Sequence, residues 1–262
     1  GKIIYCLWSD VFVCPDCSSE VVFWDSAVDT DNAEVRDIFS CQNCNSKLSK
    51  SNAEHAHVTL FDSDLNLTIS QSKQVPALII YSVPGQKGRF EKIPDISDIK
   101  LINDIDRMSI SDWYPCNELP DGYNTRQPKR SHGFEHVNHF YTKRNLIVLA
   151  KLFQMANTSR FKFLFTGFIS GATKLNQFHL KNYVFGGGGI NPGPRKGTLY
   201  VPSISMEVPI ASLCKDRLQT QLKANESIAI KTLENTVIST GSFHQIVKST
   251  ECEFIDYIFI DP

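Results

Sequence analysis

The sequence predicts a mixed α+β fold in which an N-terminal zinc ribbon is followed by an α/β region. Two Cys-x-x-Cys pairs within the first fifty residues indicate the ribbon. Beyond them, β-branched runs that alternate with an amphipathic helical pattern indicate the α/β region. A composition of 42% hydrophobic and 21% charged residues is that of a globular protein, which excludes a disordered or collagen-like chain.

The first half of the chain is predicted to contain mostly short strands, and one helix. The strands are expected at residues 11–13, 21–24, 35–39 and 77–81, and a charged helical region at 94–107. The segment from 115 to 130 is rich in Pro, Gly, Asn and basic residues, so an exposed connection is expected there.

The second half opens with the clearest helical signal in the sequence. Thr142 is a suitable N-cap for a helix at 143–156, which has apolar residues on one face. The other elements expected are a helical stretch at 161–172, strands at 198–201 and 204–208, a long helix at 210–234, and buried strands at 236–239 and 254–260.

The apolar runs are too short for a membrane protein. Runs such as those at residues 77–81 and 146–150 fall far below the ~18 residues that a membrane span requires, so no membrane partner is expected. No signal-peptide progression opens the sequence, and the cysteines are too few for a secreted disulfide scaffold. The sequence therefore predicts a cytoplasmic protein.

Four cysteines, Cys14, Cys17, Cys41 and Cys44, follow the pattern C-x2-C-x23-C-x2-C. Two residues between thiolates let the backbone turn around one ion, and two such turns complete a tetrahedron of sulfurs about 2.3 Å from Zn²⁺. Because four thiolates leave no position for water or substrate, the predicted role is structural, and metal binding would contribute about 10–16 kcal/mol to ordering the segment. A redox or iron–sulfur centre and four unrelated thiols are the alternatives.

Residues 136–206 contain nine Lys and Arg and no Asp or Glu, although the whole chain has a net charge of only −1. Eleven aromatic residues are interspersed with these cations. Cations of this kind meet phosphates and aromatic faces stack on exposed bases, so the stretch predicts contact with DNA. The alternative is a solvated basic surface with its aromatic residues in the core. The predicted DNA-binding residues are Lys143, Arg144, Lys174, Lys181, Arg195 and Lys196.

Two further motifs favour a structural interpretation. His136 and His139 lack the third ligand that a metal site needs, so a hydrogen-bonded pair is expected. The glycine tetrad at 186–189 is followed by Asn-Pro-Gly-Pro instead of the helix that a phosphate-binding loop requires. It is expected to be a loop, either beside the substrate or as a plain surface turn.

The chain closes with a strand-like run, residues 254–260, that delivers Asp261 and Pro262 at its carboxyl end. Together with the four-cysteine ribbon, the segment HFYTKRNL at 139–146 and the run KGTLYVPSISME at 196–207, this ending resembles the bacterial adenine-specific DNA methylases that contain a zinc ribbon. In these enzymes the motif Asp-Pro-Pro-Tyr/Phe is the catalytic signature, and the chain matches its first two residues.

The resemblance implies methyl transfer from S-adenosylmethionine to an amino group of DNA, most often N6 of adenine. Asp261 would accept a hydrogen bond from the amino group, and Pro262 would help to present a backbone carbonyl to it. The target base would be flipped out of the duplex. A restriction or accessory subunit is a further partner that the resemblance implies.

Since no Phe-x-Gly-x-Gly loop precedes the motif, the S-adenosylmethionine site is expected outside these residues, and the piece alone is expected to be inactive. The resulting division is a ribbon at 1–50, a mixed α/β connecting region at 51–130, a basic, aromatic-rich recognition region at 131–235, and a partial catalytic core at 236–262 whose strands belong to an incomplete Rossmann-like sheet. A non-enzymatic zinc-ribbon nucleic-acid-binding protein and a structural interaction module are the alternatives.

Overall fold

The computed structural model describes residues 1–62 and 65–227. The chain divides into two compact units, Gly1–Thr220 and Gln221–Pro262. The strands expected at 236–239 and 254–260 lie outside the described residues, as do Asp261 and Pro262, so the expected Rossmann-like sheet stays a prediction. What the described residues show is a mixed α/β fold with an antiparallel sheet.

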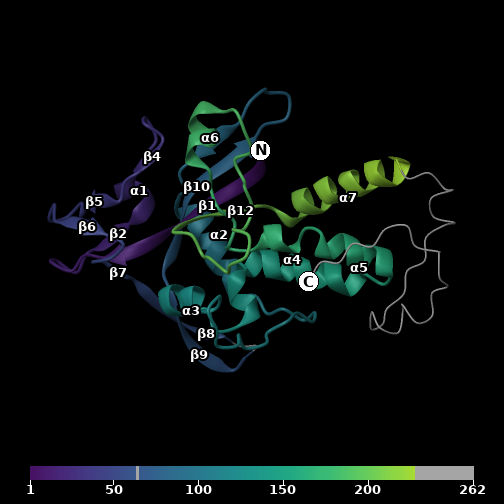
Figure 1. The fold of residues 1–262 in the computed structure, drawn as a ribbon, viewed down its shortest axis with the longest axis horizontal. Coiled ribbons are helices and arrows are strands. Elements are labelled where there is room, and N and C mark those ends of the chain that lie inside the picture. The colour runs from purple at the N-terminus through teal and green to yellow at the C-terminus, as the bar shows by residue number, and fades with distance from the viewer. Residues whose placement is uncertain (63–64, 228–262) are drawn as a thin grey trace, which may run out of the picture. The chain divides into compact units, whose positions relative to one another are not determined.

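The central sheet is built around one long strand, β1 (Lys2–Val13), as Figure 1 shows. The first part of β1 pairs antiparallel with β10 (Gln74–Ser82) on one side and with β12 (Ile204–Glu207) on the other. β11 (Phe90–Lys92) extends the sheet beyond β10. The strands predicted at 77–81 and 204–208 are thereby confirmed. One apolar cluster holds this part of the sheet together, and its buried members are Tyr5, Leu7, Leu78, Ile80 and Met206.

The last residues of β1 belong to the ribbon. Val11 to Val13 pair with β2 (Glu20–Val22), and Phe12 and Val13 also pair with β7 (Glu54–His55). Phe12 is fully buried and heads the apolar cluster of the ribbon. One continuous strand therefore serves both the ribbon and the central sheet.

A helical turn replaces part of the strand that we predicted at 21–24. α1 (Phe23–Ala27) begins directly after β2, and its two buried side chains, Phe23 and Ala27, are four residues apart on one face. The ring of Phe23 contacts Phe12 and Phe39, with centroid distances of 5.7 and 5.4 Å. The prediction of a strand over Phe23 and Trp24 was wrong because this aromatic core is reached by a turn of helix.

Short hairpins complete the ribbon and lead away from it. β3 (Val28–Asp29) pairs with β4 (Glu34–Val35), and β5 (Ile38–Ser40) pairs with β6 (Lys47–Ser49). After β7, the strands β8 (His57–Asp62) and β9 (Leu67–Ser72) form a separate two-stranded antiparallel sheet. The helix predicted at 94–107 is α2 (Ile96–Asp106), which Asp95 caps through a capping box.

Not all helices of the second half were predicted: residues 126–132, which overlap the expected exposed connection at 115–130, are helical. α3 (Arg126–His132) precedes a 3₁₀ turn, η1 (Val137–Phe140). α4 (Lys143–Met155) confirms the predicted helix at 143–156, and the Thr142 hydroxyl accepts the Asn145 N–H at its start.

The helical stretch expected at 161–172 is two elements. α5 (Ser159–Thr166) ends at Gly167, and the 3₁₀ turn η2 (Ile169–Ala172) follows it. α6 (Leu180–Phe185) ends at Gly186, which begins the predicted glycine loop with a φ of 74°. α7 (Ile210–Ser227) is the described part of the helix predicted at 210–234. No helix within the described ranges combines the length and apolarity needed to cross a membrane.

Residues 198–201 are not a strand, contrary to our prediction. The side-chain amide of Gln127 accepts the Val201 N–H at 2.9 Å and donates to the Val201 carbonyl at 3.1 Å. This amide thus satisfies the backbone groups that a neighbouring strand would otherwise pair. Val201 is buried although it belongs to no strand.

Candidate functional site

The four predicted metal ligands come together at the tip of the ribbon. The Sγ atoms of Cys14 and Cys44 are 3.6 Å apart, and those of Cys17 and Cys41 are also 3.6 Å apart. Four sulfurs about 2.3 Å from one tetrahedral ion would lie ~3.8 Å from each other. Among the described residues all four ligand atoms fall within 4.8 Å of one another, which is compatible with a zinc ribbon.

Two equivalent turns deliver these sulfurs. In the first turn Cys14 N–H donates to Ser19 and the Ser18 N–H donates back to Cys14; in the second, Cys41 and Asn45 repeat the pattern. Ser18 and Asn45 have φ values of 58° and 61°, the left-handed conformation that such turns require. The cluster can hold a metal such as zinc, and four thiolates would fill all four positions of a tetrahedral ion.

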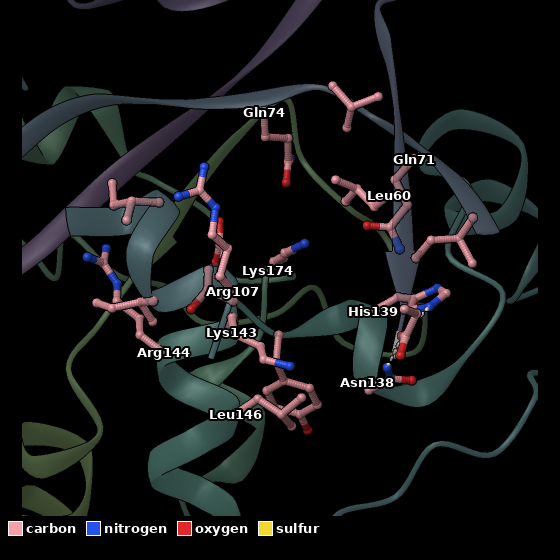
Figure 2. Close-up of a pocket in the computed structure, with 18 of the residues that line it drawn as sticks. Leu60, Gln71, Gln74, Arg107, Asn138, His139, Lys143, Arg144, Leu146 and Lys174 are labelled. Atoms are coloured by element: carbon pink, nitrogen blue, oxygen red, sulfur yellow. Dashed lines mark hydrogen bonds and ion pairs between the residues drawn. The ribbon is translucent and has the colours of Figure 1, made fainter. Parts of the chain in front are cut away.

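A cavity of about 660 Å³, lined by both polar and apolar side chains, lies outside the ribbon, and Figure 2 shows part of its lining. Segments far apart in the sequence surround it: β8, β9, the end of α2, the turn η1 and the start of α4. Three of the six predicted DNA-binding residues line this cavity, namely Lys143, Arg144 and Lys174. Half of the residues predicted to bind DNA thus lie in one cavity wall, and Arg107, which follows α2, adds a fourth cation to this wall.

Lys174 extends into the middle of the residues drawn in Figure 2. Its Nζ lies 4.8 Å from the centre of the Phe134 ring, but it forms no hydrogen bond or ion pair with any other residue that the structure describes. Burial lowers the pKa of Lys174 to about 8, and the negative charge of Asp106 opposes this shift. The ammonium therefore remains mostly charged at neutral pH and has three donors without an acceptor.

His139 and Asn138 present further unmatched groups in the wall of the cavity. The Nδ1 atom of His139 accepts the backbone N–H of Glu135 at 3.1 Å, which leaves the proton of the neutral ring on Nε2. Burial, then His136 and Lys174, lower the pKa of His139 to about 4, so the ring is neutral at pH 7. Its Nε2 and the Oδ1 atom of Asn138 are both buried without a hydrogen-bond partner among the described residues.

The prediction that His136 and His139 form a hydrogen-bonded pair is therefore confirmed in part, because His139 Nδ1 accepts backbone hydrogen bonds. The rings of His136 and His139 meet edge to face, with centroids 5.2 Å apart, and neither belongs to a metal-ligand group among the residues described. One nitrogen of His139 holds the backbone of η1, and the other faces the cavity as a donor. Beside it, Asn138 Nδ2 donates to Asp62 at 3.1 Å, which leaves its oxygen as a free acceptor.

Arg144 differs from Lys174 because it already has a partner. Its guanidinium binds Glu207 through two nitrogens, and the same carboxylate accepts Thr142 Oγ1 at 2.5 Å and Trp8 Nε1 at 2.6 Å. Burial opposes the charge on Arg144, but its hydrogen bonds with Glu207 outweigh burial and raise the pKa of the guanidinium. Arg144 therefore anchors α4 to β12 and contributes a compensated charge to the cavity wall.

The other predicted DNA-binding residues lie away from this cavity. Lys181 is on α6, and Arg195 and Lys196 are on the loop that follows the glycine tetrad. The guanidinium of Arg195 lies 5.9 Å from the centre of the Tyr200 ring. None of the four tetrad glycines lines the cavity. The assignment of Lys181, Arg195 and Lys196 to DNA binding stays a prediction.

Several cavity residues could not be identified from the sequence, because they belong to no motif or charged stretch. Gln71 and Gln74 come from strands that the acid-free stretch does not include, and Arg107 follows α2, whose charged residues are mostly acidic. Their positions depend on pairing between distant segments.

No family model, no curated protein and no solved structure matched the chain.

Proposed function

We propose that this chain is the part of an S-adenosylmethionine-dependent DNA amino-methyltransferase that contributes a structural zinc ribbon and the recognition of DNA. The support is the coincidence of the ribbon cysteines with three segments of methylase-like sequence, at 139–146, 196–207 and 255–262. N6 of adenine is the proposed target, and a restriction or accessory subunit is a proposed partner.

The observation that carries the DNA-binding part of this proposal is the ammonium of Lys174, which lines the cavity without a hydrogen-bond acceptor among the described residues. A cation that is partly withdrawn from water and lacks an acceptor is costly unless an anion binds it. A DNA phosphate is such an anion, and Lys143 and Arg107 in the same wall add positive charge around it. The unmatched donor of His139 and acceptor of Asn138 are suited to the edge of a base or a sugar.

The proposed chemistry depends on Asp261 and Pro262. S-adenosylmethionine, when bound, supplies the methyl group, and no residue of this chain is assigned to its binding. Asp261 would accept a hydrogen bond from the amino group of the flipped base, and Pro262 would help to present a backbone carbonyl to the same group. The zinc ion would occupy the four thiolates and take no part in the reaction.

Replacing Lys174 tests the DNA-binding part. We expect Lys174→Met to weaken binding to a fluorescently labelled duplex about tenfold at 100 mM salt, measured by anisotropy, because one desolvated phosphate contact is lost. Lys151→Met is the matched control: Lys151 is an exposed cation of the same acid-free stretch that does not line the cavity. Equal loss in both variants would show that general charge, and not the cavity, binds DNA.

Methyl transfer tests the enzymatic part and separates the two candidate classes. In the complete reading frame, we expect transfer of labelled methyl groups from S-adenosylmethionine to DNA, and Asp261→Ala should abolish it while DNA binding is retained. Binding of DNA without any methyl transfer by the complete protein would favour the non-enzymatic zinc-ribbon protein instead.

A further inference from the structure

A second group of metal-ligand side chains lies apart from the cysteines. The carboxylate of Asp10 is fully buried; its Oδ2 is 3.1 Å from Nε2 of His55, and its Oδ1 is 3.3 Å from Nε2 of His132. Asp10 is on β1, His55 on β7, and His132 is the last residue of α3. The three ligand atoms lie within 4.8 Å of one another, so the fold brings two imidazoles and one carboxylate to a single point.

The neighbours of His132 determine which of its nitrogens carries a proton. The Ser131 hydroxyl donates to the Gln127 carbonyl at 2.6 Å and accepts from the Gln127 amide at 3.0 Å. Its remaining lone pair faces His132 Nδ1 at 2.6 Å, so Nδ1 must be the donor in that contact. This leaves Nε2 of the neutral ring without a proton, directed at the Asp10 carboxylate.

Two unshared electron pairs that face each other 3.3 Å apart repel, so a positive charge belongs between them. The charge is either a second proton on the imidazole or a metal ion. Metal-binding histidines commonly donate their other ring N–H to a fixed acceptor, and Ser131 supplies that acceptor to His132. The carboxylate is held in the same way, because Gln74 Nε2 donates to Asp10 Oδ1 at 2.9 Å.

The separations and the number of donors fit a metal ion. Ligand atoms about 2.1 Å from a tetrahedral metal lie ~3.4 Å apart, close to the 3.3 Å between Asp10 and His132. Both carboxylate oxygens face imidazole nitrogens, so a chelating Asp10 with His55 and His132 offers four donor atoms. Two histidines and one carboxylate are a ligand set that divalent zinc and iron both accept.

The rings are fixed in place, and one of them reaches the surface. The imidazole of His55 stacks against Phe12, with centroids 4.6 Å apart, and that of His132 lies 5.5 Å from Phe134. The side chain of His132 is 2% exposed and that of His55 is 20% exposed. His55 therefore marks the side from which an ion would enter.

We propose that Asp10, His55 and His132 form a second metal site that binds one divalent transition metal ion, zinc foremost, independently of the cysteine cluster. An ion held there would cross-link β7 and α3 to β1, and so tie the base of the ribbon to the central sheet. Metal binding at this site does not depend on the proposed methyltransferase activity.

Metal content of the purified 262-residue chain tests the site. After equilibration with excess Zn²⁺ and removal of unbound metal, the wild-type chain should contain two zinc ions by elemental mass spectrometry. Asp10→Asn and His132→Gln, which retain polar side chains of similar size, should each contain one. His57→Gln is the control, because His57 is exposed and lies two residues from His55. It should retain two.

One zinc ion in the wild-type chain, or two in Asp10→Asn, would overturn the proposal and leave a proton-bridged Asp–His cluster. Cobalt reconstitution of the wild-type protein gives an answer that does not depend on a variant's folding. The cysteine site should produce strong sulfur-to-cobalt charge-transfer absorption. A second equivalent should add only weaker visible bands, as expected for nitrogen and oxygen ligands. Binding of a single, sulfur-ligated equivalent would equally refute the second site.

Discussion

Glu207 is the first acidic residue after the acid-free stretch, and it determines how two of the cations in that stretch behave. Its buried carboxylate binds the guanidinium of Arg144 through two nitrogens. Lys174 lines the same cavity, but the nearest carboxylates act on it only over longer distances. An arginine with a compensated charge positions α4, whereas a lysine without a hydrogen-bond acceptor can receive an anionic ligand.

The lowered pKa of His139 predicts a loss of stability on mild acidification. The folded-state pKa is about 4, below the ordinary value of 6.5, so the contribution of this group is fully present above pH 6.5 and is lost as the pH falls toward 4. Between pH 6.5 and 5 the free energy of unfolding should decrease by about 1.5 kcal/mol through His139 alone. Urea unfolding of the wild type and of His139→Gln measures it.

The wild type should lose more stability than the variant over that pH range. The same decrease in both proteins would show that other groups cause it and that His139 is not neutral in the fold. Because His139 lines the cavity together with Asn138 and Lys174, the experiment also reports on the protonation of the cavity wall.

At the residue scale, the sequence could identify ligands that are local but not partners that are distant. The two cysteine pairs were predicted correctly because each pair is contained in one short turn. Arg144 and Lys174 could not be told apart, because the carboxylate that distinguishes them is 63 positions from Arg144. Asp10, His55 and His132 gave no signal for the same reason: pairing of β1 with β7 and the end of α3 brings them together.

At the scale of elements, local signals were sufficient for the helix with the clearest cap and apolar face, but not for the extent of every strand. Thr142 and the apolar face behind it were sufficient to place α4. The length of β1 was not predicted, because its first part, including Cys6 and Trp8, has no simple alternation and is buried on both sides of the sheet. Residues 198–201 had the composition of a strand, but the Gln127 side chain occupies the place of a partner strand.

Metal removal should unfold the ribbon from Cys14 onward and leave most of β1 folded. The ribbon has a small core, and metal binding supplies about 10–16 kcal/mol to such sites, so a strong chelator should abolish amide protection in β5 and β6. Tyr5 and Leu7 should remain protected, because they are buried in the central cluster between β10 and β12. Hydrogen exchange measured by mass spectrometry resolves these segments.

Two outcomes would contradict this prediction. Unchanged protection of β5 and β6 after complete metal removal would show that the four thiols do not hold the ribbon through an ion. Loss of protection across the whole of β1 would show that the ribbon and the central sheet unfold as one cooperative unit.

At the scale of the whole molecule, the uneven charge distribution matters more than its sum. The chain has a net charge of −1, yet residues 136–206 carry nine cations and no acidic residue. Attraction to a polyanion follows local potential and the release of counterions, so the near-neutral total does not prevent binding.

Binding to DNA should therefore weaken steeply with salt. If the cavity cations neutralise two or more phosphates, the logarithm of the binding constant should fall with the logarithm of salt concentration with a slope of about −2 or steeper. Anisotropy titrations between 50 and 200 mM salt measure the slope, and Lys174→Met should make it shallower by about 0.9. No affinity for DNA at low salt would favour the structural interaction module.

The double use of β1 restricts how the ribbon could be exchanged or transplanted. A cut after residue 50 would separate β7 from β1, and removal of Val11 to Val13 would shorten β1, whose preceding residues pair with β10 and β12. Swapping in another zinc module would require the donor to supply a strand that continues in register into the sheet. Changes in the ribbon and in the sheet are therefore constrained to occur together.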